Sequence, residues 1–210
     1  MAATVERYRI PKEEVRREIE KVRGSRFIAT LAPAATVEEA ESHLARVRAE
    51  FHDSRHTCSA WRLGPAGSIW RAQDDGEPGG SAGRPILAQL EGAELTNAVL
   101  LVTRYFGGTK LGVGGLVRAY GSAAAAAIEA ATIREVVVTL PHLVRHPYSC
   151  SSAVEAILAA HDLAPRDASY GEEVSFHLDL TPAQARGVCA ELIERSSGLV
   201  QCELVEEADA

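Results

Sequence analysis

Residues 104–118 of the chain read RYFGGTKLGVGGLVR, and this stretch decides the fold because it joins a predicted strand directly to a predicted helix. The run of valine and leucine across residues 97–105 predicts a well-buried strand. From 113 to 131, apolar residues such as Leu116 and Tyr120 repeat at helical spacing, and the many alanines favour a helix intrinsically. A buried strand, a glycine loop and an apolar helix indicate an α+β protein.

The same glycine loop combines a permissive backbone with positive charge. Glycine lets backbone amides approach a ligand closely, and the start of a helix offers unpaired N–H groups. No acidic residue occurs between Glu94 and Glu129, so the loop's cations have no acidic neighbour in the sequence. The spacing matches neither a Walker A loop nor a dinucleotide fingerprint, and a tight strand-to-helix turn is the alternative. We predict an anion-binding or RNA-binding site, with phosphate as the natural ligand, formed by Arg104, Lys110, Gly112, Gly114, Gly115 and Arg118.

Upstream of the loop, the hydrophobic spacing predicts alternating helices and strands. Thr36 and Glu39 fit a capping box in front of a helix that runs to about Glu50. Turn residues between two short apolar runs predict a β-hairpin. The predicted elements are a helix at 11–23, a strand at 25–31, a helix at 37–50, hairpin strands at 57–63 and 68–73, and a helix at 84–90.

Downstream, the pattern changes to a simple βαββαβ order. Val174, Phe176 and Leu178 alternate with polar residues, as a sheet with one covered face requires. The order suits a ferredoxin-like split βαβ domain. Its predicted elements are strand 136–140, helix 151–161, strands 167–170 and 173–180, helix 182–195 and strand 199–205. We therefore predict two domains, residues 1–132 and 133–210.

Composition and charge narrow the functional classes. The chain is 46% hydrophobic, enough for a real core, and carries a net charge of −7. Residues 1–132 hold 17 basic and 16 acidic residues, a charge of +1, whereas residues 133–210 hold 5 and 13, a charge of −8. Any polyanion site is therefore expected in the first domain. With neither a signal-like start nor an apolar run of membrane length, we expect a cytoplasmic protein without membrane partners.

The cysteines and the acidic turn offer further chemistry. Cys58, Cys150, Cys189 and Cys202 have no metal-ligand spacing and are interpreted as reduced thiols, mostly buried. His56 and Cys58 lie two apart on a predicted strand and could pair as base and nucleophile, although a core cysteine beside an edge histidine is favoured.

Carboxylates at 74–77 could hold Mg²⁺, but a solvated turn or a surface for a basic partner is favoured over a metal site. No cofactor is predicted, and the second candidate surface comprises Asp74, Asp75, Glu77, Arg84 and His56.

Three stretches carry a family resemblance. DDGEPGGSAGRP at 74–85, RYFGGTKLG at 104–112 and GGLVRAY at 114–120 resemble the YigZ/IMPACT family, as does His-Thr-Cys at 56–58. The resemblance covers roughly residues 25–131, and the later part of the chain is more loosely similar to the family's accessory domain. It departs at 79–81, where Gly-Gly-Ser replaces the usual Ser-Gly-Thr and removes one hydroxyl.

The resemblance implies both a fold and a biological setting. It implies a ribosomal protein S5 domain 2-like domain followed by a ferredoxin-like domain similar to elongation factor G domain V. For eukaryotic relatives it implies control of translation, through competition for the ribosome-associated activator of an initiation-factor kinase. The leading hypothesis is a non-enzymatic, translation-linked protein that docks RNA, the ribosome or a ribosome-associated translation factor through the glycine loop. The alternatives are an enzyme acting on a phosphorylated small molecule or nucleotide, and an adaptor that binds partners through its acidic second domain.

Overall fold

The computed structural model describes residues 5–205, which form two compact units that divide between Val136 and Val137. The first unit is built on a five-stranded sheet in which all neighbouring strands are antiparallel. The long apolar run predicted before the glycine loop is the central strand of this sheet. In spatial order the strands are β2 (Val15–Glu18), β3 (Arg26–Pro33), β6 (Ala98–Tyr105), β4 (His56–Leu63) and β5 (Ile69–Gln73).

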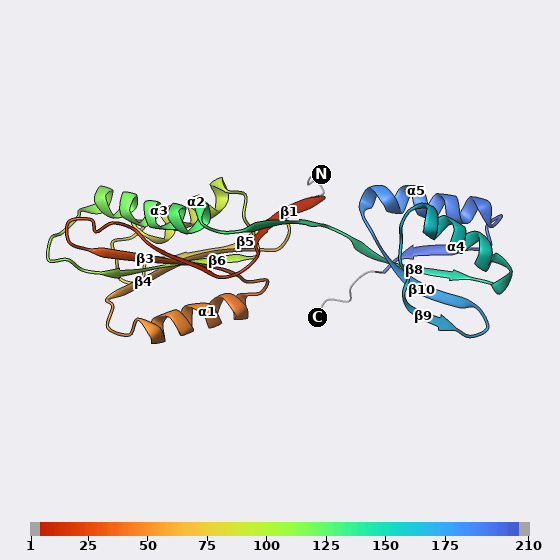
Figure 1. Cartoon of the computed structure of the whole chain (residues 1–210), viewed down its shortest axis with the longest axis horizontal. Helices are drawn as coiled ribbons and strands as arrows, with labels where there is room; N and C mark the ends of the chain where they lie inside the picture. Colours follow the sequence, from red (N-terminus) through yellow and green to blue (C-terminus); the bar gives the residue numbers. More distant parts are fainter. Residues whose placement is uncertain (1–4, 206–210) are drawn as a thin grey trace. The chain divides into compact units, whose positions relative to one another are not determined.

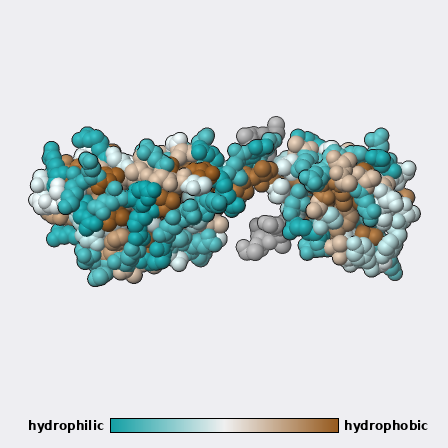
Figure 2. All heavy atoms as spheres, in the orientation of Figure 1, coloured by the Kyte–Doolittle hydropathy of each residue, from teal (hydrophilic) through white to brown (hydrophobic). Residues whose placement is uncertain are grey.

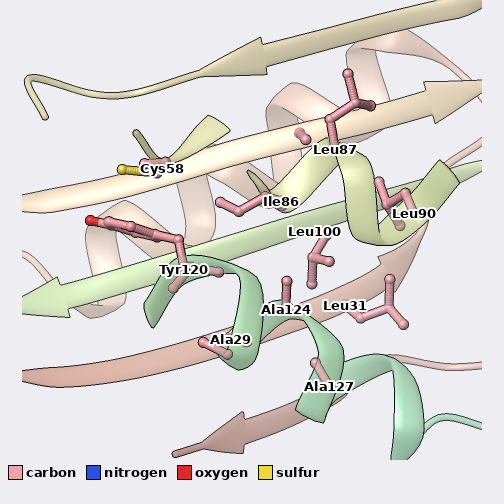
Figure 3. Packing of buried hydrophobic residues seen from close by; sticks show 14 of the residues in the cluster. Ala29, Leu31, Cys58, Ile86, Leu87, Leu90, Leu100, Tyr120, Ala124 and Ala127 are labelled. Carbon is pink, nitrogen blue, oxygen red and sulfur yellow. The ribbon is translucent and has the colours of Figure 1, made fainter. Parts of the chain in front are cut away.

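Helices cover both faces of this sheet (Figure 1). α2 (Gly83–Gly92) and α3 (Val113–Glu129) pack on one face, and α1 (Val37–Glu50) packs on the other. Small residues on α3, Ala123, Ala124 and Ala127, are fully buried and let the helix approach the strands closely. Figure 3 shows Ala124 and Ala127 facing leucines of the sheet and of α2.

Most elements predicted for this unit are confirmed, but the helix predicted at 11–23 is wrong. Residues Val15–Glu18 instead form β2, with Val15 opposite Leu31 of β3. The guanidinium of Arg16 lies 5.1 Å from the Phe51 ring centroid and pairs with Glu50 at the end of α1. Strand pairing and these long-range contacts outweigh the helical spacing, which is a weak preference in so short a segment.

A two-stranded ribbon ends the first unit. β1 (Arg7–Pro11) pairs with β7 (Ile133–Val137). The strand predicted at 136–140 is therefore misplaced, because it straddles the end of β7 and the start of the next strand, β8 (Leu140–His146). Valine and threonine run continuously through this region, so composition alone does not reveal the break between the two strands.

The second unit has the βαββαβ order expected from the sequence. Its antiparallel sheet has the order β11–β8–β10–β9, and both helices cover the same face (Figure 1). The core lies between that face and the helices. After β8 and a 3-10 turn (Tyr148–Cys150), the elements are α4 (Ser151–Ala160), β9 (Arg166–Tyr170), β10 (Val174–Leu180), α5 (Pro182–Arg195) and β11 (Gln201–Leu204).

The prediction of four reduced thiols is wrong for two of them. Cys58 and Cys150 are buried free thiols, but Cys189 and Cys202 form a disulfide that joins α5 to β11. The two residues are 13 positions apart, and the packing of α5 beside β11 brings their Cα atoms to 5.6 Å. That distance lies within the usual range for a disulfide, and sequence spacing alone did not indicate it.

At the surface, hydrophobic residues form small patches among hydrophilic ones on the face shown in Figure 2. No helix within residues 5–205 is both long and apolar enough to cross a membrane.

A substitution at Gly107 would test how tightly the glycine loop packs on the turn between β2 and β3. A Cβ added at Gly107 would lie 1.9 Å from the carbonyl carbon of Gly24 and 2.2 Å from the amide nitrogen of Ser25. We expect Gly107→Ala to lower the free energy of unfolding of the first unit by about 2 kcal/mol or more, because backbone must move. Urea titration followed by tryptophan fluorescence reports on this unit alone, since Trp61 and Trp70 both lie in it.

Gly79→Ala is the matched control, because a Cβ there meets nothing within 4 Å. Equal unfolding midpoints for the two variants would contradict the close packing of the loop.

Candidate functional site

The glycine loop ends in an uncapped helix. Gly112 occupies the N-cap position of α3 with a φ of 71°, a conformation that favours glycine. None of the side chains in residues 5–205 caps this end, and the first turn of α3 holds no acidic residue. The first N–H groups of the helix therefore keep their positive partial charge, which favours a bound anion.

Arg104 does not extend into solvent but is buried at the base of the loop. Its Nη1 donates a hydrogen bond of 2.7 Å to Oε1 of Glu77, and only 6% and 5% of the two side chains are exposed. The guanidinium lies 5.6 Å and 5.5 Å from the ring centroids of Phe27 and Phe106. Although the loop's cations have no acidic neighbour in the sequence, Arg104 has one in the structure, because Glu77 reaches it from a different turn.

Tyr120 completes this buried cluster from α3. Its hydroxyl donates to the same Oε1 of Glu77 at 2.7 Å. Ser25 adds a further link, since its Oγ accepts a hydrogen bond from the amide of Gly107 at 3.1 Å and from Nη2 of Arg104 at 3.3 Å. The cluster of Arg104, Glu77, Tyr120 and Ser25, called here the polar clamp, thereby fixes the loop to the sheet, to α3 and to the acidic turn.

Sequence reasoning missed Tyr120 and Ser25 as members of this cluster. Tyr120 belongs to the apolar stripe of α3, so its position indicated burial and gave no sign of a hydrogen-bond partner. Ser25 had no distinguishing signal beyond the glycine before it.

Cys58 and Tyr120 lie side by side in the core, with thiol and hydroxyl at the same end (Figure 3). Burial raises the pKa of the Cys58 thiol to about 12, and burial together with the neighbouring Cys58 raises the pKa of Tyr120. The thiol donates to the carbonyl of Asp74 at 3.0 Å. His56 uses Nδ1 to donate to the carbonyl of Asp75 at 2.7 Å, so the two side chains serve separate backbone oxygens. This geometry supports a core cysteine rather than a base and nucleophile pair.

The acidic turn is a set of internal hydrogen-bond acceptors. The carboxylate of Asp74 accepts from the amides of Gly80, Ala82 and Gly83, at 2.8, 2.9 and 2.8 Å, and so holds the start of α2. Burial opposes ionisation of Asp74, but these three amides together hold its pKa below the usual value.

Asp75, the next residue, is also an acceptor of internal hydrogen bonds. Its carboxylate accepts from the amide of Thr57 at 2.7 Å and from the Arg48 guanidinium at 2.6 Å. The carboxylates of Asp74, Asp75 and Glu77 are thus each engaged separately. Across residues 5–205, no group of three or more histidine, cysteine, aspartate or glutamate side chains is placed to hold a metal ion.

The remaining loop residues line two cavities. The first, called here the loop cavity, has a volume of about 340 Å³ and is lined by Glu77, Arg104, Phe106, Lys110 and Gly112, among others. A second cavity, also of about 340 Å³, is lined by Gly115 and Arg118 together with Ile19, Val22 and Arg23 of the β2–β3 turn. Leu111 contributes to both.

Apart from Gly114, each predicted site residue of the loop therefore lines one of these two cavities. Lys110 and Arg118 are exposed, and neither has an acidic partner within 4.0 Å in the described part of the chain. Gly114 is exposed in the first turn of α3.

The residues of the second candidate surface make different contacts. His56 contacts Asp75, Glu77 contacts Arg104, and Asp74 contacts the start of α2. The guanidinium of Arg84, in the first turn of α2, lies over the ring of Trp70, 4.8 Å from its centroid.

Comparisons with known proteins agree with the resemblance read from the sequence. Residues 23–128 match the Impact N-terminal domain, and residues 144–199 match a domain of unknown function (DUF1949). An IMPACT family member encoded in the pol 5' region of Thermus thermophilus is 42% identical over 168 residues, covering 80% of this chain and 90% of that protein. The IMPACT family member YigZ of Escherichia coli is 35% identical over 191 residues, covering 90% and 94%.

Two further similarities extend this pattern. The Protein IMPACT homolog of Saccharomyces cerevisiae is 32% identical over 95 residues, which is 43% of this chain and 36% of the yeast protein. A crystal structure described as that of a hypothetical protein has a TM-score of 0.71 and 35% identity, covering 98% of this chain and all of the other.

The polar clamp can be tested by neutralising its acid. Glu77→Gln leaves the Arg104 guanidinium buried without its counter-charge, and we expect the free energy of unfolding of the first unit to fall by about 3 to 5 kcal/mol. The measurement is urea unfolding followed by tryptophan fluorescence.

The control is Glu18→Gln, which breaks a bidentate pair with Arg26 whose side chains are 39% and 43% exposed. An exposed pair is worth less than about 1 kcal/mol. If Glu77→Gln costs no more than Glu18→Gln, the clamp does not hold the loop.

Proposed function

The chain belongs to the IMPACT family, and from this premise we propose that it is a translation-linked binding protein that docks RNA through its glycine loop. The observation that carries the proposal is the uncapped start of α3, flanked by Lys110 and Arg118 without acidic partners among residues 5–205. Backbone N–H groups at a helix start and neighbouring cations together form a typical phosphate-binding arrangement. RNA on the ribosome, or a ribosome-associated translation factor, is the setting that the family resemblance implies.

The architecture is part of the same proposal. We assign the first unit to the ribosomal protein S5 domain 2 type, and the second to the ferredoxin-like type similar to elongation factor G domain V. The sheet order β11–β8–β10–β9, with both helices on one face, supports the second assignment. Matches to two separate domain families, at 23–128 and 144–199, support a boundary near residue 132.

The individual loop residues take different parts in this function. Amides of Gly112, Gly114 and Gly115 contact a phosphate, and Lys110 and Arg118 neutralise its charge from either side. Arg104 is committed to Glu77, so it positions the loop and lines the cavity from within. The near-neutral first domain, at +1, permits an approach of RNA that the second, at −8, opposes.

A phosphorylated small molecule is the second candidate ligand, because the loop cavity has a size typical of small-molecule sites, about 340 Å³. Catalysis has less support. The buried thiol of Cys58 has a pKa of about 12, and Glu77 is engaged by Arg104 and Tyr120. A thiol with so high a pKa is not a ready nucleophile near neutral pH, and Glu77 is held by hydrogen bonds within the fold.

The RNA proposal predicts a salt-dependent loss in a double variant. We expect Lys110→Ala/Arg118→Ala to raise the dissociation constant for a fluorescein-labelled single-stranded RNA about tenfold. The slope of log affinity against log salt should fall by about 2, because two phosphate contacts are removed. Fluorescence anisotropy at several KCl concentrations measures both quantities.

Lys12→Ala/Arg134→Ala removes the same charge from two exposed positions of the first unit and serves as the control. The proposal fails if wild type does not bind RNA, or if both double variants weaken binding equally. A thermal shift with inorganic phosphate or ATP that is lost only in Lys110→Ala/Arg118→Ala, without RNA binding, would instead favour the small-molecule candidate.

A further inference from the structure

The second unit contains an apolar cleft between α4 and the β9–β10 hairpin. It has a volume of about 130 Å³, and its lining includes His146, Tyr148, Val154, Leu158, Tyr170 and Phe176. We call it the α4–β9 cleft. Since a water molecule occupies about 30 Å³ in the liquid, the cleft has room for one aliphatic or aromatic side chain.

Two tyrosines form the rim of this cleft. Tyr148 is 53% exposed and Tyr170 is 73% exposed, whereas Val154 and Phe176 below them are buried. The hydroxyl of Tyr148 donates to the carbonyl of Gly171 at 3.1 Å, which fixes its ring beside the opening. Exposed tyrosines over an apolar floor are typical of protein interfaces, because tyrosine supplies contact area and keeps a polar tip.

The strand beside the cleft has one edge that no other strand within residues 5–205 pairs with. β9 lies at the edge of the sheet, with β10 as its neighbour on one side, and all five of its residues are exposed. Its pairing with β10 shifts register between Ser175 and His177. An edge strand offers unpaired N–H and C=O groups to an extended segment of another chain.

One acidic residue lines the cleft, and another lies in the neighbouring turn. Glu155 lines the cleft, and Glu172 follows Tyr170 in the β9–β10 turn. Neither has a basic partner within 4.0 Å in the part of the chain that the structure describes. The whole of residues 133–210 carries 13 acidic and 5 basic residues, a charge of −8. Such a surface repels RNA and attracts positive charge.

We propose that the α4–β9 cleft binds an extended basic segment of a partner protein. The segment places one apolar side chain between Tyr148 and Tyr170, pairs its backbone with β9, and sets lysine or arginine beside Glu155 and Glu172. The apolar side chain supplies affinity, and the acidic rim selects basic over acidic partners. This site lies wholly in the second unit and does not depend on the glycine loop.

The test uses the full chain and a short fluorescein-labelled synthetic peptide in which lysines flank one central phenylalanine. We expect binding by fluorescence anisotropy, and at least about tenfold weaker binding when alanine replaces the phenylalanine, as the loss of one buried aromatic side chain predicts. A peptide with glutamates in place of the lysines should not bind. The proposal is overturned if the phenylalanine peptide does not bind, or if the alanine peptide binds equally well.

Substitutions in the chain would show where the peptide binds. Ala168→Trp fills the cleft from its exposed lining and should abolish binding, whereas Leu199→Ala, at a residue 58% exposed elsewhere in the unit, should not change it. Glu155→Lys should weaken binding, and Glu194→Lys on α5 should do so much less. Circular dichroism checks that each variant is folded; should Ala168→Trp unfold the unit, Tyr170→Ala and Glu155→Lys decide in its place.

Other outcomes would show that the peptide binds elsewhere or that something else occupies the cleft. Peptide binding that survives in Ala168→Trp and in Tyr170→Ala would place the peptide elsewhere and contradict the proposal. A dimer that sedimentation detects and that Ala168→Trp dissociates would assign the cleft to a second copy of the chain. Lys110→Ala/Arg118→Ala should bind the peptide like wild type, so failure at the loop and failure at the cleft are distinguishable.

Discussion

The buried ion pair between Arg104 and Glu77 determines how the first unit presents its loop. Removing two charges from water is costly, and the cost is offset only where the geometry is good and the remaining polar atoms are satisfied. Here Tyr120 and Ser25 supply further hydrogen bonds and two phenylalanine rings flank the guanidinium, while Nε of Arg104 alone in this group has no hydrogen-bond partner within residues 5–205. Because the four clamp residues come from the β2–β3 turn, the acidic turn, β6 and α3, the pair fixes those segments together. The base of the loop is consequently fixed, while the start of α3 has no side-chain cap.

Sequence reasoning succeeded where one local signal dominates. The central strand β6, the helix α3 and the βαββαβ order all follow from hydrophobic periodicity over long segments. Sequence reasoning failed where the residues that interact are far apart in the sequence. Charges counted along the loop do not reveal that Glu77, 27 positions upstream, neutralises Arg104. Helical spacing at 11–23 likewise does not reveal that β3 accepts Val15–Glu18 as an edge strand, and cysteine spacing did not predict the pairing of Cys189 with Cys202.

The two units differ in their charge. In the first, charges nearly cancel overall, so the local excess at Lys110, Arg118 and the start of α3 sets the potential at the loop. In the second, the acidic excess is spread over the unit, with Glu155 lining an apolar cleft and Glu172 in the β9–β10 turn. A polyanion and a basic polypeptide are therefore the ligands that we propose for the two units. A ribonucleoprotein particle offers both kinds of surface, which is compatible with the translation link that we propose.

The residues that carry the family resemblance are mainly structural. Asp74 holds the start of α2, Asp75 holds β4, and Glu77 holds Arg104. Gly107 permits the contact between the loop and Gly24. A sequence motif can therefore be highly characteristic of a family because its residues must make many internal contacts at the same time. None of its side chains needs to touch a ligand. It follows that motif matching identifies this fold more securely than it identifies an activity. Function is better sought in groups that the clamp leaves unengaged, and in the first unit these include Lys110, Arg118 and the first amides of α3.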